Sequence, residues 1–164
     1  MCDMKVIFLD IDGVLNHNNS REVVKGGIIG LNKECCTQLK RIVDTTGAKI
    51  VLVSTWKMWW SPIYDECKFD GKYLSDTFNE CGLSIIDKTT GPCGDGRGQG
   101  ILNYIEAHKD IESYIVLDDE IFNDYRCSKI MSRLVKTSFY KWGLTKELAD
   151  RAIQLLGGTN DSKS

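Results

Sequence analysis

Two carboxylates, Asp10 and Asp12, directly follow an unbroken apolar run at residues 6–9. The run is too short for a typical helix and rich in strand-forming residues, so it predicts a buried strand of a parallel sheet. Side chains two positions apart on a strand face the same way, about 7 Å apart along the chain. Such a pair suits a reaction in which one carboxylate binds a hard cation and attacks an electrophile, while the other transfers a proton. Gly13 permits a sharp exit from the strand, because glycine tolerates backbone angles forbidden to other residues.

The same residues have two plainer interpretations. A calcium loop also contains Asp-x-Asp-Gly, but it follows a helix, has glycine at its sixth position and closes with a bidentate glutamate. Here the segment follows an apolar run, the glycine stands fourth and the closing glutamate is missing. A polar turn at the end of a strand is the second alternative. The catalytic interpretation therefore depends on further polar residues that meet Asp10 and Asp12.

Two other apolar runs end in residues suited to phosphoryl chemistry. The run at residues 49–53 is followed by the hydroxyl residues Ser54 and Thr55. The run at residues 114–117 is followed by the carboxylates Asp118 and Asp119. A strand-helix-strand unit is right-handed and brings both strand ends to one edge of the sheet. We therefore expect these side chains to lie with Asp10 and Asp12 at the carboxyl edge, where open α/β sheets bind ligands.

The rest of the chain supplies the elements that position this edge. Amphipathic spacing and capping residues predict helices, whereas short apolar runs predict strands. Helices are expected at residues 32–46, 74–81, 101–108 and 145–156, further strands at 83–86 and 134–136, a loop or small hairpin at 16–30, and a loop with five glycines at 89–100.

This alternation predicts an α/β fold, a Rossmann-like three-layer sandwich with a mostly parallel sheet of about five strands. Residues 1–158 are expected to form a single domain, and the polar tail at 159–164 to be disordered.

The composition narrows the function classes. The net charge is −2 and the pI about 5.7, so there is no global basic footprint for nucleic acid. Seven cysteines without a Cys-x-x-Cys pair, no signal peptide and no apolar run that could cross a bilayer predict reduced thiols, a cytoplasmic location and no membrane partner. Since the only histidines are His17 and His108, a zinc site is not expected.

Three tryptophans stand close behind the second strand: Trp56, Trp59 and Trp60. Beside a catalytic edge, such rings could stack on a nucleobase. Alternatively they pack a short helix against the sheet. The sequence leaves both interpretations open.

The motifs at the strand ends resemble those of the haloacid dehalogenase (HAD) superfamily of phosphohydrolases. FLDIDGVLN resembles its first motif, VLVST its second and VLDDE its fourth, in the paired-acid form. The third motif is a basic residue near a helix start, usually Lys; Arg97 in GRGQGILNYI is the best placed candidate, with Lys57 and Lys88 as alternatives. STWK, RGQGILNYI and the closing RLVKT…GLT segment resemble the small, capless HAD domains of Swiss-army-knife RNA-repair proteins. The likeness covers most of residues 4–156, although that subgroup typically has Arg at the position of Lys57.

The resemblance implies a Mg²⁺-dependent phosphatase with an aspartyl-phosphate intermediate. Asp10 would be the nucleophile, and Asp12 would protonate the leaving oxygen and then deprotonate the attacking water. The ion, which suits an all-oxygen site, would be held by Asp10, the main-chain carbonyl of Asp12 and a carboxylate of the fourth motif. Either Asp118 or Asp119 can be that ligand.

Ser54, Arg97 and the main-chain amides of Ile11 and Thr55 are expected to bind the phosphoryl oxygens. The intervals between motifs leave no room for a separate cap domain, so the site would be open to bulky substrates. The subgroup points to an RNA or DNA end, or a nucleotide, as the phosphorylated partner. A phosphatase of small metabolites or phosphoproteins and a non-catalytic nucleotide-binding module are the alternatives.

Overall fold

The computed structural model describes residues 3–21, 23–24 and 28–157. Its centre is a five-stranded parallel sheet in the order β5-β4-β1-β6-β7. The order confirms the expected Rossmann-like α/β architecture and places the short strand β7 at an edge. The strands are β1 (Met4–Leu9), β4 (Lys49–Leu52), β5 (Ile85–Lys88), β6 (Ile111–Asp118) and β7 (Leu134–Lys136).

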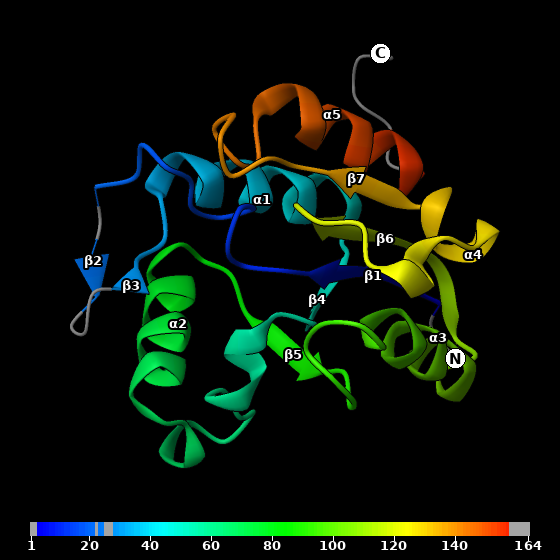
Figure 1. Ribbon diagram of the computed structural model, residues 1–164, viewed down its shortest axis with the longest axis horizontal. Helices are drawn as coiled ribbons and strands as arrows, with labels where there is room; N and C mark the ends of the chain where they lie inside the picture. The colour runs from blue at the N-terminus through cyan, green and yellow to red at the C-terminus, as the bar shows by residue number, and fades with distance from the viewer. Residues whose placement is uncertain (1–2, 22, 25–27, 158–164) are drawn as a thin grey trace.

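Helices cover both faces of the sheet and complete a three-layer sandwich (Figure 1). Side chains alternate across β1, so that Ile7 and Leu9 pack in the cluster that includes α1 and α5, whereas Val6 and Phe8 pack with α3 and α4. The helices are α1 (Lys33–Thr46), α2 (Phe69–Glu80), α3 (Arg97–Ala107), α4 (Ser128–Met131) and α5 (Lys146–Leu155). Because both faces of β1 are buried, its run of apolar residues needs no polar alternation.

The caps expected for α1 and α5 are present. The side chain of Asn32 accepts a hydrogen bond from the Cys35 amide, and that of Thr145 accepts one from the Leu148 amide. Gly47 ends α1 with φ 74°, a left-handed conformation that favours glycine. Local sequence therefore sets these helix ends.

Two helices begin earlier than expected, because glycines inside them serve packing. A Cβ at Gly71 would lie 1.9 Å from the carbonyl oxygen of Trp59, so glycine lets α2 approach that backbone. In α3, a Cβ at Gly98 would lie 2.8 Å from Asp124, and one at Gly100 would lie 2.5 Å from the Thr90 oxygen. The expected loop at 89–100 is therefore wrong for residues 97–100, which form the first turn of α3.

The strand β5 was expected at residues 83–86 but spans 85–88. The Leu83 amide donates to the Phe78 carbonyl at 2.8 Å and the Gly82 amide donates to the Asn79 carbonyl at 3.1 Å. These two bonds form a Schellman motif, in which the apolar residue after the glycine packs back on the helix. Leu83 is therefore buried as part of the helix end, before the strand begins.

The segment at 16–30 contains a small antiparallel pair, β2 (Val23–Val24) with β3 (Ile28–Ile29), as one of the two expectations had it. The tail at 159–164 lies outside the described residues, so its expected disorder stays a prediction. Across the described part of the chain, no helix has the length and apolar character needed to span a membrane.

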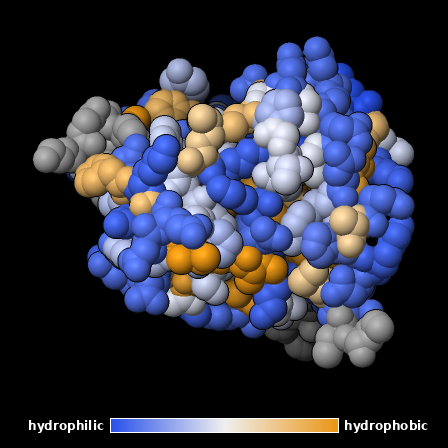
Figure 2. Space-filling view, turned by 90° about the horizontal axis from the view of Figure 1, so that it is seen from below, coloured by the Kyte–Doolittle hydropathy of each residue, from blue (hydrophilic) through white to orange (hydrophobic). Residues whose placement is uncertain are grey.

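Most of the exposed large hydrophobic side chains lie in two segments, apart from Ile86 and Met131. The first is the segment 58–69, which leads into α2; the second is the loop after β7, where Tyr140 is 75% and Trp142 59% exposed. The face seen from below is mostly hydrophilic but carries a hydrophobic patch (Figure 2). The exposed residues of the first segment are Met58, Ile63, Tyr64 and Phe69.

Candidate active site

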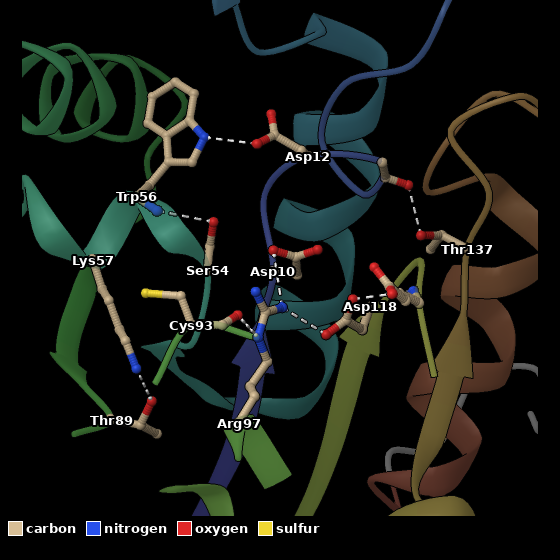
Figure 3. A network of polar contacts seen from close by, with 12 residues as sticks. Asp10, Asp12, Ser54, Trp56, Lys57, Thr89, Cys93, Arg97, Asp118 and Thr137 are labelled. Carbon is tan, nitrogen blue, oxygen red and sulfur yellow. Dashed lines mark hydrogen bonds and ion pairs between the residues drawn. The ribbon is translucent and has the colours of Figure 1, made fainter. Parts of the chain in front are cut away.

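Parallel pairing of β1 with β6 brings two of the expected acidic residues together. Leu9 and Leu117 are register partners, and the Asp10 amide donates to the Leu117 carbonyl at 2.9 Å. Asp10 and Asp118 therefore stand side by side at the carboxyl edge of the sheet (Figure 3). Asp119 follows on the same edge, and carboxylate oxygens of the three residues lie within 4.8 Å of one another. We call Asp10, Asp118 and Asp119 the acidic cluster.

Arg97 is the cation that faces this cluster. Its Nη1 atom lies 2.8 Å from Oδ2 of Asp118 and 3.3 Å from Oδ1 of Asp10, and its Nε donates to the Cys93 carbonyl at 2.7 Å. Burial alone would lower the pKa of Arg97, but the charges of Asp10 and Asp118 outweigh it and raise that pKa. The guanidinium is therefore a fixed positive charge in a buried position.

One guanidinium does not neutralise three carboxylates. Burial, followed by the negative charge of Asp118, raises the pKa of Asp10 well above its ordinary value. The same two causes raise the pKa of Asp119 to about 6. The cluster thus has more converging negative charge than its neighbours compensate, and a hard divalent cation with oxygen ligands fits that arrangement.

Asp12 is held apart from the acidic cluster. Its Oδ2 accepts a hydrogen bond from Trp56 Nε1 at 3.1 Å, and its Oδ1 accepts one from Asn16 Nδ2 at 2.9 Å. Because β1 ends at Leu9, regular strand alternation does not orient Asp12; its bonds to Trp56 and Asn16 do (Figure 3). Both residues nevertheless line one pocket of about 410 Å³. Ligation by the Asp12 carbonyl stays a prediction.

The end of β4 forms another wall of the site. Ser54 is buried, and its Oγ accepts a hydrogen bond from the Trp56 amide at 3.2 Å, which caps a short 3₁₀ helix at Thr55–Met58. Its own hydroxyl proton remains available to donate. Thr55 is exposed and lines the pocket, whereas the side chain of Ile11 is buried in the core.

The tryptophans after β4 belong mainly to the core. Trp56 is 1% and Trp60 4% exposed, and both lie in the cluster of α1 and α5. Trp59 is partly buried, edge-on to Trp56 with ring centroids 6.0 Å apart. The stacking interpretation is therefore wrong for Trp56 and Trp60, which have no face open to a base.

Of the three basic candidates for the third motif, Arg97 is the one that contacts Asp10. Lys57 is buried and its Nζ donates to Thr89 Oγ1 at 3.2 Å; burial is the main cause that lowers the pKa of its ammonium. Lys88 Nζ donates to the carbonyls of Lys57 and Trp60 at 2.8 and 2.6 Å. Lys88 therefore stabilises the end of the 3₁₀ helix.

Three polar residues of the site escaped the sequence analysis. The Tyr125 hydroxyl donates to Asp118 Oδ2 at 2.6 Å, and Thr137 Oγ1 donates to the Gly13 carbonyl at 2.6 Å. Asn16 Oδ1 accepts from the Gly13 amide at 2.9 Å, a short-range turn bond that its spacing could have indicated. Thr137 lies 124 positions from Gly13, and Tyr125 lies seven positions from Asp118, so neither bond has the short spacing of a turn.

Gly13 lies against the acidic cluster itself. It has φ 84°, and a Cβ there would lie 2.0 Å from Asp119 Oδ2. Glycine is thus required twice at this position, for the turn after β1 and for the approach of Asp119. The DxDG signal at residues 10–13 therefore has a steric cause in the fold.

Comparison with known proteins agrees with this geometry. Residues 6–149 match the family described as the HAD domain in Swiss Army Knife RNA repair proteins. Comparisons with curated proteins and with solved structures found no match. The family match runs from within β1 to the first turn of α5 and includes the ends of the strands that carry the acidic cluster, as well as Arg97. The chain therefore belongs to the family of HAD domains found in Swiss Army Knife RNA repair proteins.

Proposed function

We propose that this domain is a Mg²⁺-dependent phosphatase that forms an aspartyl-phosphate on Asp10. Membership of a HAD family suggests phosphatase-type chemistry in general. The observation that supports the specific proposal best is the acidic cluster, in which Asp10 at the end of β1 meets Asp118, Asp119 and the guanidinium of Arg97. A binding module would not need three converging carboxylates with so little compensating charge.

Asp10, Asp118 and Asp119 would hold the metal, together with the main-chain carbonyl of Asp12. When bound, the cation supplies positive charge that offsets the repulsion between the Asp10 carboxylate and a phosphate dianion. Arg97 adds a fixed charge beside Asp10, where charge on the equatorial phosphoryl oxygens develops.

The reaction would proceed in two displacements. A carboxylate oxygen of Asp10 attacks phosphorus, the bond to the leaving oxygen breaks, and Asp12 gives that oxygen a proton. Asp12 then takes a proton from a water whose oxygen attacks the same phosphorus, which releases phosphate and restores Asp10. The bonds from Trp56 and Asn16 would orient Asp12 for both transfers.

Ser54 and Thr55, with the Ile11 and Thr55 amides, would bind the phosphoryl oxygens. The site should be open to a large substrate, since the described segments between the motifs form the β2–β3 pair, α1, α2, the sheet strand β5 and short 3₁₀ turns, and none of these makes up a separate cap domain. We propose a phosphorylated nucleic-acid end or nucleotide as the substrate class, in line with the RNA-repair context of the family.

The experiment is a Mg²⁺-dependent phosphate-release assay on 5′- and 3′-phosphorylated RNA and DNA, nucleotides, phosphopeptides and a small aryl phosphate. Asp10→Asn, nearly isosteric, should abolish release while the melting curve shows a folded domain. Asp65→Asn, at an exposed carboxylate before α2, is the matched control and should keep full activity. More than a few per cent of wild-type turnover in Asp10→Asn at saturating metal would exclude the covalent mechanism.

A further inference from the structure

The loop that follows β7 presents aromatic rings and lysines beside the acidic cluster. Tyr140 and Trp142 are 75% and 59% exposed; Lys136 precedes them and Lys141 stands between them, and both lysines are exposed. We call residues 136–142 the aromatic loop. None of the roles proposed above for the phosphatase site uses these side chains.

Several bonds fix the aromatic loop to the edge that carries the site. The Thr137 amide donates to the Asp118 carbonyl at 3.0 Å, and its hydroxyl donates to the Gly13 carbonyl at 2.6 Å. The Asn18 amide donates to the Phe139 carbonyl at 2.9 Å. Lys136 is the register partner of Asp118, so the loop starts one strand spacing, about 5 Å, from the acidic cluster.

The backbone of the aromatic loop is strained at Trp142, whose ring is exposed. Trp142 has φ 69° and is, in the described part of the chain, the one non-glycine residue with a positive φ. That conformation is costly for a large side chain, and such outliers concentrate at functional sites. A Cβ on the following Gly143 would lie 2.8 Å from the Val14 carbonyl, so the loop is pressed tightly against the chain after β1. His17 contacts the Trp142 ring edge-on, with centroids 5.2 Å apart.

From this arrangement we infer that the aromatic loop binds the single-stranded nucleic acid that adjoins a phosphorylated end in the active site. The inference rests on the proposed phosphatase function and names the part of the substrate that lies outside the pocket. Exposed rings that stack on bases, interleaved with lysines that meet the phosphate backbone, are the means by which proteins bind single strands without sequence preference.

The other exposed hydrophobic segment does not fit this ligand. Residues 58–69 carry exposed apolar side chains too, but Asp65 and Glu66 are exposed within the segment and Asp70 follows it. These carboxylates would repel a phosphate backbone, whereas Lys136 and Lys141 attract it. Charge therefore distinguishes the aromatic loop from this segment, which can serve as an internal control.

The geometry predicts that binding depends on the length of the strand. Lys136, where the loop starts, lies in β7, two strands from β1 and about 10 Å away at ordinary strand spacing, so a strand of several nucleotides should bridge the loop and Asp10 better than one nucleotide does. A mononucleotide should gain little from the aromatic loop. A hexanucleotide should reach it, and quenching of the exposed Trp142 should accompany its binding.

The test measures the affinity of unphosphorylated, dye-labelled hexanucleotides of RNA and DNA by fluorescence anisotropy, so that catalysis does not enter. Tyr140→Ala combined with Trp142→Gly should weaken binding by at least about fivefold per ring. Glycine suits the positive φ of residue 142, and residue 140 is mostly exposed, so the variant should melt as the wild type does. Phe69→Ala removes an equally exposed ring from the control segment and should leave binding unchanged.

A second measurement tests the lysines. Lys141→Gln should reduce the slope of log affinity against log salt concentration by about 0.7, the value for one phosphate contact on a single strand. Lys68→Gln, at an exposed lysine beside the control segment, should leave the slope unchanged.

Wild-type affinity in the Tyr140→Ala/Trp142→Gly variant would overturn the inference, as would an equal loss in Phe69→Ala. Absence of measurable oligonucleotide binding by the wild type would also overturn it. If the rings prove necessary for binding while no phosphate is released from any substrate, the proposed function fails and the binding surface stands.

Discussion

The two aromatic groups that flank the acidic cluster have opposite environments. After β4, Trp56 and Trp60 are almost completely buried, and the Trp56 indole donates to Asp12. After β7, Tyr140 and Trp142 are mostly exposed, on a loop fixed to the same edge of the sheet. Both groups of rings therefore lie beside the site, but only Tyr140 and Trp142 are accessible to a ligand. An aromatic ring near catalytic residues supports them from within in the first case and faces the solvent in the second.

The largest effects are expected in the acidic cluster between the two groups, where a change should affect every substrate equally. Asp119→Asn should weaken metal affinity by about 10–100-fold or more. Asp118→Asn should do the same and also lower the melting temperature, because Arg97 and Tyr125 both bond to that carboxylate. Mg²⁺ titrations of activity, with melting curves for both variants, measure this. Negligible shifts in the titrations of both variants would mean that the metal lies elsewhere.

A large effect is also expected for Trp56→Leu, which tests the buried group. Loss of the ring should lower the free energy of unfolding by about 2–4 kcal/mol. Loss of the indole bond to Asp12 should slow hydrolysis of a phosphorylated oligonucleotide and of a small aryl phosphate by the same factor. Chemical denaturation and parallel kinetics check the two parts, with Trp60→Leu as the control, since its indole bonds to Ser75 instead. A defect confined to the oligonucleotide would contradict the comparison.

Trp59 is the intermediate case and should give an intermediate result. Its ring packs edge-on to Trp56 but is only partly buried. Trp59→Leu is expected to lower the free energy of unfolding by about 1 kcal/mol. Its kinetics on the two substrates should stay close to the wild type. A rise in KM for the oligonucleotide alone would show that Trp59 contacts the ligand, as is inferred for Tyr140 and Trp142.

The smallest effect on stability is expected at the exposed group. Trp142→Gly relieves a left-handed conformation, which offsets the greater flexibility of glycine in the unfolded chain. The free energy of unfolding should therefore change by no more than about 1 kcal/mol, as measured by denaturant titration. A loss as large as that of Trp56→Leu would show that the ring is structural, and the contrast between the groups would disappear.

Much of the fold follows from local sequence. Residues 6–9 predict β1, Asn32 and Thr145 cap the helices that they were expected to cap, and residues 134–136 form the edge strand at its expected bounds. The polar residues at the strand ends follow too, since parallel strands bring their carboxyl ends to one edge. Asp10, Asp118 and Asp119 meet for that reason.

The predicted element boundaries were wrong where a residue type can serve either of two structures and the local sequence does not distinguish them. The glycines at residues 98 and 100 suggested a loop, but they lie in α3 and let it approach its neighbours closely, as Gly71 does in α2. Leu83 suggested a strand, but it is buried against the end of α2. In each case the partner surface that explains the residue comes from another part of the chain.

The sequence by itself determined the order of elements, the parallel sheet and the residue types available at its carboxyl edge, because periodicity, caps and turn residues act over a few positions. Only the tertiary structure decided that Arg97 pairs with Asp10 and Asp118, that Trp56 orients Asp12, and that Trp142 faces solvent. Exposure and pairing of a side chain depend on which surface packs against it, and that surface lies far away in the sequence.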